Sequence, residues 1–155
     1  MRQPGYVDIF DADFNSPGLN NTCDTTFNWF DQAGIPGCTY RCPIIPYDDM
    51  YITQNTTLAQ GIYNIVDNYQ TTGQKGVILM NTNNVFLDCN GSTINGPGSG
   101  VGIKIFNVNN VTVKNCRLTG YWEGIRLTNA NNSIITNNTI TSNQVGIVPV
   151  DDIPP

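Results

Sequence analysis

Apolar and polar residues alternate in short runs along the second half of the chain, and the same run occurs three times. The copies read GVILMNTNNVFL from Gly76, GIKIFNVNNVTV from Gly102 and GIRLTNANNSII from Gly124. The first two glycines are 26 residues apart, and the next steps, to Gly124 and to Gly146, are 22 residues each. A short fixed period is typical of a solenoid, in which each repeat buries its apolar face against its neighbours.

Alternation with a period of two predicts β-strands that bury one face. Each copy contains one such strand before its asparagines, a second after them, and a shorter third. The residues expected on the buried face are Val77/Leu79, Ile103/Ile105 and Ile125/Leu127 in the first strand, Val85/Leu87, Val111/Val113 and Ser133/Ile135 in the second, and Ile94, Leu118 and Ile140 in the third. Three strands in 22 residues leave no room for a helix. The sequence therefore predicts an all-β fold, a parallel β-helix of about three to four coils spaced about 4.8 Å apart.

The interior of such a coil holds columns of like residues, for example Leu79 over Ile105 over Leu127. Lys104 and Arg126 fall on the opposite, outer face. The apolar residues expected to face outward with them are Ile78, Met80, Phe86, Phe106 and Ile134. Such a stripe is too apolar to face water alone, so we expect aromatic residues of the N-terminal segment or of a neighbouring chain to cover it.

Asparagines recur at matching positions of the copies. The matched sets are Asn81/Asn107/Asn129, Asn83/Asn109/Asn131, Asn84/Asn110/Asn132 and Asn115/Asn137. Asparagine tolerates the left-handed backbone of tight corners, and its amide can bond the amide of the next coil. We expect columns of amides that satisfy polar groups turned inward; the alternative is that these are surface-loop asparagines.

Three segments follow from the extent of the pattern. Residues 1–49 form an irregular, aromatic-rich N-terminal arm or cap that contains several prolines, residues 50–148 form the β-helix, and residues 149–155 form a proline-rich tail. We expect Pro149 to stop the last coil, because proline cannot donate a ladder hydrogen bond.

The β-helix is expected to begin with a degenerate coil over residues 50–66. Two strands are predicted there, Met50–Thr53 and Gly61–Val66, separated by a polar turn at Asn55–Thr57. This segment and the arm before it would cap one end of the stacked core, since an uncapped core meets water.

The other end of the solenoid has no predicted cap. The apolar residues expected at this open, stackable end are Leu127, Ile135, Ile140 and Ile147. Exposed strand edges and core residues invite pairing with another chain. Either the chain is a fragment of a longer solenoid, or the capping region of another subunit docks there.

Charge and composition restrict the partners. Lys and Arg total 7 against 12 Asp and Glu, a net charge of −5, so nucleic acid and acidic membrane surfaces are poor partners. No apolar run approaches the roughly 18–20 residues that span a bilayer. No signal peptide follows Met1, so we expect a mature or excised chain, or one that stays inside the cell. Few lysines, abundant Asn and Thr, and five cysteines favour an extracellular or cell-surface location.

The cysteines fall in two groups. Cys23, Cys38 and Cys42 lie in the N-terminal segment, and a disulfide within Cys38–Cys42, or from Cys23 to one of them, is favoured over a zinc site because the chain has no histidine. Cys89 and Cys116 lie in adjacent coils and either form a bridge or are buried as small apolar residues. No metal or other cofactor is predicted.

Six Asn-x-Ser/Thr triplets occur, and an Asn- and Thr-rich chain produces some by chance. Three of them begin in the asparagine columns, where a glycan does not fit an inward amide. The remaining candidates for glycosylation are Asn20, Asn55 and Asn90.

The repeated pattern GIxLxNxNNVTVxNCxLTG resembles the right-handed β-helix repeats of the pectin-lyase-like superfamily, and most of all the NosD-like repeats of prokaryotic surface proteins. The segment VFLDCNGSTING from Val85 is similar to the phrase that opens such arrays. The resemblance covers residues 50–148 and implies a right-handed coil. It implies little about function, because the same coil carries enzymes, adhesins and fibre proteins.

Three functions follow as hypotheses. An enzyme of this fold needs grouped acids, whereas the repeats contain only Asp88 and Glu123, so we expect no catalysis. Carbohydrate binding is the alternative, because Tyr121 and Trp122 are expected to protrude beside Arg126 and to contact a sugar or a partner. The favoured hypothesis is a non-catalytic surface protein whose open end stacks on the cap of the next copy and builds a homo-oligomer or filament.

Overall fold

The computed structural model describes residues 44–68 and 76–150 and four short strands before them. These strands are β1 (Ile9–Phe10), β2 (Thr26–Phe27), β3 (Phe30–Gln32) and β4 (Ile35–Pro36). β1 pairs with β2 in parallel and β3 with β4 antiparallel. The chain divides into two compact units, Met1–Pro43 and Ile44–Pro155.

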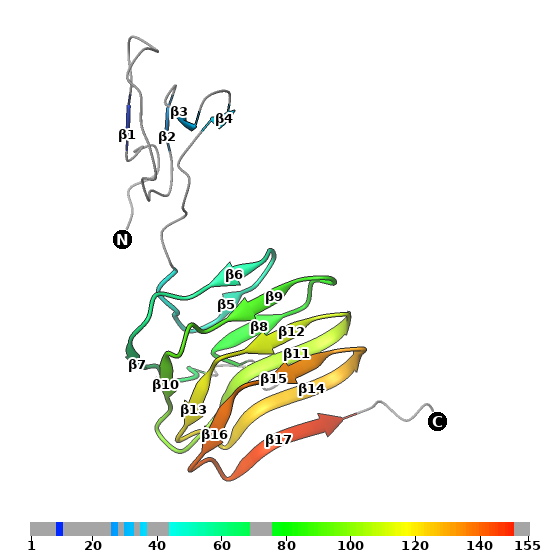
Figure 1. The fold of residues 1–155 in the computed structure, drawn as a ribbon. Helices are drawn as coiled ribbons and strands as arrows, with labels where there is room; N and C mark the ends of the chain where they lie inside the picture. The colour runs from blue at the N-terminus through cyan, green and yellow to red at the C-terminus, as the bar shows by residue number, and fades with distance from the viewer. Residues whose placement is uncertain are drawn as a thin grey trace. The chain divides into compact units, whose positions relative to one another are not determined.

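The second unit consists of three parallel sheets whose strands lie in successive rows (Figure 1). The first sheet contains β5 (Met50–Tyr51), β8 (Ile78–Met80), β11 (Val101–Asn109), β14 (Glu123–Asn131) and β17 (Val145–Val150). The second contains β6 (Thr56–Thr57), β9 (Phe86–Asp88), β12 (Thr112–Lys114) and β15 (Ile134–Thr136). The third contains β7 (Ile62–Asn64), β10 (Thr93–Asn95), β13 (Arg117–Thr119) and β16 (Thr139–Thr141).

The chain visits the three sheets in turn, so each coil contributes one strand to each sheet. No helix occurs in the described ranges. These observations confirm the predicted all-β class and the parallel β-helix. The strands amount to four coils and the first strand of a fifth.

The core lies between the three sheets and consists of stacked apolar columns. One column runs through Ile78, Ile103 and Ile125, which are fully buried and pair in register. Ile94 pairs with Leu118 in the third sheet, and neither is exposed. Burial of each such side chain contributes about 1.5–3 kcal/mol, so the columns supply most of the stabilisation.

The predicted inward face of β8 is wrong by one residue. Ile78 pairs with Ile103 and Met80 with Ile105, whereas Leu79 pairs with Lys104 of the outer face. Met80, and not Leu79, therefore lies in the column of Ile105. Met80 and Phe86 are six residues apart, whereas their partners in the next coil, Ile105 and Thr112, are seven apart, and a one-residue offset exchanges the two faces of a strand.

The asparagine columns form, but on the corners and not in the interior. Nδ2 of Asn110 donates to Oδ1 of Asn84 over 2.9 Å, and Nδ2 of Asn129 donates to Oδ1 of Asn107 over 3.1 Å, all at exposed positions. Within residues 44–68 and 76–150, eight of the ten non-glycine residues with positive φ are asparagines, so the left-handed corner fixes their positions. Asn81, displaced by the same offset, has no positive φ and lies outside the Asn107 column.

Two asparagines of the last coil bond the backbone of the preceding coil instead. Oδ1 of Asn138 accepts from the Cys116 amide over 2.8 Å, and Oδ1 of Asn143 accepts from the Tyr121 amide over 2.8 Å. Both side chains also donate to carbonyl oxygens of that coil. At these two positions the last coil has asparagine where the preceding coil has the core side chains of Cys116 and Tyr121.

The two ends of the predicted β-helix also need correction. Thr56–Thr57 was expected to be a turn but forms strand β6, and Thr56 is buried and pairs with Leu87. Pro149 was expected to stop the last coil, yet β17 continues to Val150 and Pro149 pairs with Leu127. An edge strand tolerates proline because only one of its sides needs ladder hydrogen bonds.

Candidate functional site

Exposed large apolar side chains concentrate at the two ends of the solenoid. Those of the first coil and its flank are Ile44, Ile45, Tyr47, Tyr51, Ile62 and Val66. Those of the last coils are Trp122, Ile134, Val145, Ile147 and Val150. None of the large apolar residues in 76–121 is exposed to this extent. We call these two sets the first rim and the last rim.

The predicted stacking residues lie at the last rim as expected, with different exposures. Leu127, Ile135 and Ile140 are partly buried against the core, whereas Ile147 is 46 % exposed. Ile147 pairs with the fully buried Ile125, so it continues an interior column that no described coil covers. Among the described strands, β17 therefore has a neighbour on one side only.

The first end differs from the last end. Met50, in the same column as Ile147, is only 4 % exposed, and Leu58 is fully buried. Ile44 pairs along the free side of the second sheet, where its amide donates to Thr57 and its carbonyl accepts from Ala59. The core residues of the first coil are therefore covered, whereas Ile147 at the other end is not.

The two predicted aromatic contact residues lie in opposite environments. Tyr121 was expected to protrude but is 1 % exposed, and its hydroxyl donates to the carbonyl of Ile65 over 2.9 Å. Glycines at the neighbouring corners leave space for this ring, which is why it turns inward. Trp122 is 52 % exposed, so it alone of the two can contact a ligand or partner.

Charged side chains gather on the outer face of the first sheet. Lys104 pairs with Arg126 there, as predicted. Arg126 forms an ion pair with the buried Glu123, between Nη2 and Oε1. Nε of Arg126 and Oε2 of Glu123 have no hydrogen-bond partner, so one contact rather than two joins the pair. Asp67 lies nearby, and its Oδ2 accepts from the Val101 amide over 3.0 Å.

The pKa values of this cluster are shifted chiefly by burial. Burial raises the pKa of Asp67, and the negative charges of Asp48 and Asp49 raise it further. Burial, followed by repulsion from Arg126, lowers the pKa of Lys104. Asp67 was not predicted as a site residue, because it lies outside the repeats and nothing in the sequence aligns it with Lys104.

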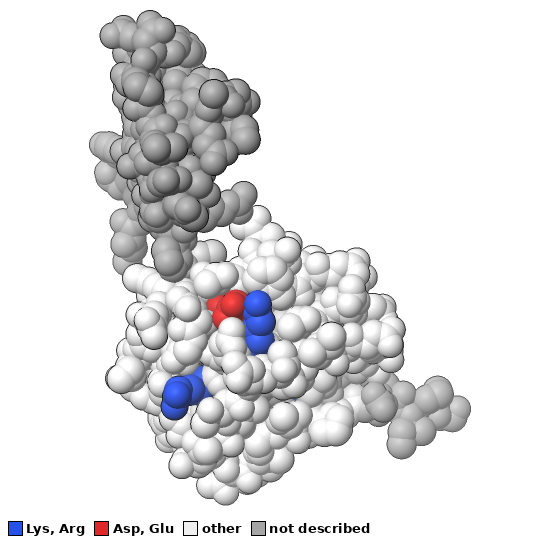
Figure 2. Space-filling view, viewed as in Figure 1, with Lys and Arg blue, Asp and Glu red and all other residues white. Residues whose placement is uncertain are grey.

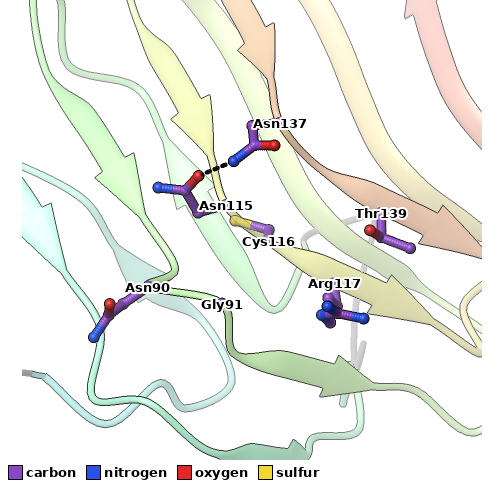
Figure 3. Close-up of a pocket in the computed structure, with 7 residues that line it drawn as sticks. All are labelled: Asn90, Gly91, Asn115, Cys116, Arg117, Asn137 and Thr139. Carbon is purple, nitrogen blue, oxygen red and sulfur yellow. Dashed lines mark hydrogen bonds between the residues drawn. The ribbon is translucent and has the colours of Figure 1, made fainter.

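A polar groove lies at the corner between the second and third sheets (Figure 3). It has a volume of about 360 Å³ and spans three successive coils. Its lining residues are Asn90, Gly91, Asn115, Cys116, Arg117, Asn137 and Thr139. We call this site the corner groove. Figure 3 shows Asn115 and Asn137 bonded to each other on one side, with Arg117 and Thr139 on the other.

A polar network supports one wall of the corner groove. Nδ2 of Asn137 donates to Asn115, and Nδ2 of Asn115 donates over 2.8 Å to Oδ1 of Asp88. Nζ of Lys114 lies 3.2 Å from the other carboxylate oxygen of Asp88. Burial alone would raise the pKa of Asp88, but these hydrogen-bond donors lower it, so the carboxylate stays ionised.

Charged side chains are few on the face of the solenoid that Figure 2 shows, and there an acidic patch touches a basic one.

The cysteines of adjacent coils form a disulfide, Cys89–Cys116, with 4.8 Å between their Cα atoms. This bridge resolves the two alternatives left by the sequence. Cys23, Cys38 and Cys42 lie outside the described residues.

Two of the predicted glycosylation sites can be located. Asn55 and Asn90 are exposed, and Oδ1 of Asn55 accepts from the Phe86 amide over 3.1 Å. Asn20 lies outside the described residues. Glycosylation of any of the three stays a prediction.

Neither a metal-binding cluster nor a membrane-spanning helix occurs in the described ranges. No group of three His, Cys, Asp or Glu residues with the geometry of a metal site occurs there. Within the same ranges, no helix is long and apolar enough to cross a membrane.

Comparison with known proteins agrees with this fold. A family model described as right handed beta helix region matches residues 21–152, which is more than half of the chain. No curated protein and no solved structure matches the chain with significance. The match confirms the expected likeness to right-handed β-helix proteins. The narrower likeness to NosD-like repeats stays a prediction.

Proposed function

Since the chain belongs to the right-handed β-helix family, we propose that it is a non-catalytic, extracellular structural module that assembles with copies of itself by stacking the ends of the solenoid. The last rim of one copy contacts the first rim of the next. Repetition of this contact builds a homo-oligomer or filament at a cell surface.

The exposure of Ile147 carries the proposal. Its column neighbours Ile78, Ile103 and Ile125 are fully buried, because each has a coil on both sides. Ile147 is 46 % exposed, and within the described residues a coil covers it on one side only. An apolar column that ends at the surface gains free energy when another apolar surface covers it.

The difference between the two ends sets the geometry of assembly. In the last rim the column residue Ile147 is exposed, whereas at the first end the column residue Met50 is buried and Ile45 and Tyr47 are 66 % and 60 % exposed. A contact between unlike surfaces is heterologous. Unless rotation closes it into a ring, such a contact propagates into a linear filament.

The location outside the cell is supported by the disulfide. Cys89–Cys116 joins two adjacent coils and is completely buried. Stable structural disulfides are typical of secreted and surface proteins.

The non-catalytic role is supported by the partners of the buried acids. Glu123 is paired with Arg126, Asp67 accepts from the Val101 amide, and Asp88 accepts from Asn115 and Lys114. Each carboxylate therefore has a structural contact that accounts for its position.

Sedimentation velocity over a range of concentrations tests the stacking. We expect the sedimentation coefficient of the native chain to rise with concentration. Ile147→Lys places a charge on the open column and should keep the protein monomeric. The matched control is Ser99→Lys, which adds the same charge to an exposed loop in the middle of the solenoid and should associate like the native chain. A native chain that stays monomeric at millimolar concentration would refute the proposal.

Carbohydrate binding is the second candidate, favoured by the exposure of Trp122. An exposed indole ring can stack on a sugar face. The buried ion pair of Arg126 with Glu123 makes Arg126 a poor partner for an acidic sugar. A glycan array compared before and after Trp122→Ala decides this candidate, because specific binding should be lost in the variant.

A further inference from the structure

The corner groove combines a cavity with a cation that has no charged partner among the described residues. Its lining includes Arg117 and no acidic residue. Within the described residues no ion pair involves Arg117. The cations on neighbouring strands differ in this respect, since Lys114 is paired with Asp88 and Arg126 with Glu123.

The position of Arg117 keeps its guanidinium accessible. Arg117 begins β13 and pairs with Thr93 on one side and Thr139 on the other. Both neighbours are short, and Arg117 is exposed. A guanidinium group offers a planar set of donors that fits the oxygens of a carboxylate, sulfate or phosphate.

The opposite wall supplies neutral hydrogen-bonding groups whose orientation is fixed. Asn137 donates to Asn115, which donates to Asp88, so the amide orientations are fixed by the carboxylate at the end of the chain. The acceptor oxygen of Asn137 is not needed for this chain. Asn90 is exposed at the rim, at a corner with φ 53°, and adds a further amide.

We infer that the corner groove binds a hydroxyl-rich ligand that carries one oxyanion, of the chemical class of a sulfated sugar. Arg117 binds the oxyanion, and the amides of Asn90 and Asn137 together with the hydroxyl of Thr139 bind the hydroxyl groups. A sugar presents both donors and acceptors, as do these amides and this hydroxyl. The chain carries a net charge of −5, so binding depends on these local contacts and not on long-range attraction.

Amide NMR titration of the isotope-labelled monomeric variant Ile147→Lys tests the site independently of stacking. Three probes separate the contributions: glucose 6-sulfate, glucose and inorganic sulfate. We expect glucose 6-sulfate to shift the signals of Arg117 and of the Asn115 and Asn137 side chains to saturation. Glucose and inorganic sulfate should each bind at least roughly tenfold more weakly, because each lacks one half of the contacts.

Two variants test the role of Arg117. Arg117→Gln should weaken glucose 6-sulfate binding roughly tenfold to a hundredfold, as expected for loss of a charge-assisted hydrogen bond. Lys104→Gln is the matched control, since Lys104 lies on the outer face of the first sheet and neither lines the groove nor contacts its network, and it should leave binding within about twofold. Asn90→Asp, which places a negative charge at the rim, should also weaken binding.

The outcomes that overturn the inference are distinct from those that refute stacking. Signals of the corner groove that do not move with any probe would remove the site. Equal weakening by Arg117→Gln and Lys104→Gln would assign the binding to general charge. Inorganic sulfate that binds as well as glucose 6-sulfate would refute the sugar component. None of these results depends on whether the native chain associates, which sedimentation measures separately.

Discussion

The hydroxyl of Tyr121 donates a hydrogen bond of 2.9 Å to the carbonyl oxygen of Ile65, a residue 56 positions earlier in the chain. Ile65 follows strand β7 of the first coil, and Tyr121 precedes β14 of the fourth. The side chain therefore links coils that are not adjacent. The pKa of this hydroxyl is raised, above all by burial, so the group stays protonated and keeps its donor.

Removal of the hydroxyl should weaken this link. Tyr121→Phe leaves the ring in place but deprives the Ile65 carbonyl of its donor. We expect the free energy of unfolding to fall by about 1–2 kcal/mol, the usual effect of leaving a buried polar group unsatisfied. Urea denaturation followed by circular dichroism measures it, and a variant as stable as the native protein would contradict the structural role of the bond.

Gly96 is expected to tolerate no side chain, because the Tyr121 ring occupies the space beside it. A Cβ atom at Gly96 would lie 2.4 Å from Cδ1 of Tyr121 and 2.7 Å from the Gly120 carbonyl oxygen. Gly96→Ala should therefore destabilise the protein by about 1–3 kcal/mol. Gly146→Ala is the control, since its Cβ would meet nothing closer than 3.7 Å. Equal melting temperatures for the two variants would contradict this packing.

Loss of the disulfide should also lower stability. Cys89 and Cys116 are separated by 27 residues, and closing a loop of that length stabilises a fold by about 3 kcal/mol in the chain-entropy model. Replacement of both cysteines by alanine should lower the free energy of unfolding by about that amount. Peptide mapping of the non-reduced protein should recover the two cysteines in one linked pair. Recovery of both as free thiols would contradict the bridge.

Two aspartates should respond to pH in opposite directions. The pKa of Asp88 is lowered in the folded state, so its contribution to stability is complete above the unfolded pKa, about 3.9, and is lost as the pH falls through the folded value. The pKa of Asp67 is raised, so its ionised form opposes folding at neutral pH, and this effect disappears on acidification.

Asparagine substitutions separate the two effects. Asp88→Asn should destabilise the protein at pH 7 and leave less difference from the native chain in acid. Asp67→Asn should stabilise it at pH 7, because an amide oxygen can still accept from the Val101 amide without a buried charge. Thermal unfolding between pH 3 and pH 7 measures both. The same sign of effect for the two variants at pH 7 would contradict the assigned environments.

The repeated alternation was sufficient to predict the fold, because each coil repeats the same buried positions. Ile103, Ile105 and Leu118 lie in the predicted interior for that reason. The face of β8 could not be predicted, since Val77 to Met80 are all apolar and alternation is absent. The spacing from Met80 to Phe86, one residue shorter than that between their partners Ile105 and Thr112, then decided which residues face inward.

The candidate sites depended on contacts that are distant in sequence. The inward ring of Tyr121 occupies space that a Cβ atom at Gly96 or Gly102 would fill, and only the stacked coils bring these residues together. The corner groove brings together Asn90, Asn115 and Asn137 from three coils. Of these three residues, only Asn115 and Asn137 were predicted to align with each other. Asp67 lies outside the repeat, so periodicity contained no information about its neighbours.

Complementary blocked variants test end-to-end stacking most directly. Ile147→Lys blocks the last rim, and Ile45→Lys blocks the first rim, where Ile45 is 66 % exposed. Each variant alone should sediment as a monomer, because every contact would include one blocked end. An equimolar mixture should form a dimer and nothing larger, since only one pair of intact ends remains. A mixture that stays monomeric, or a single variant that still dimerises, would contradict a contact between the two different rims.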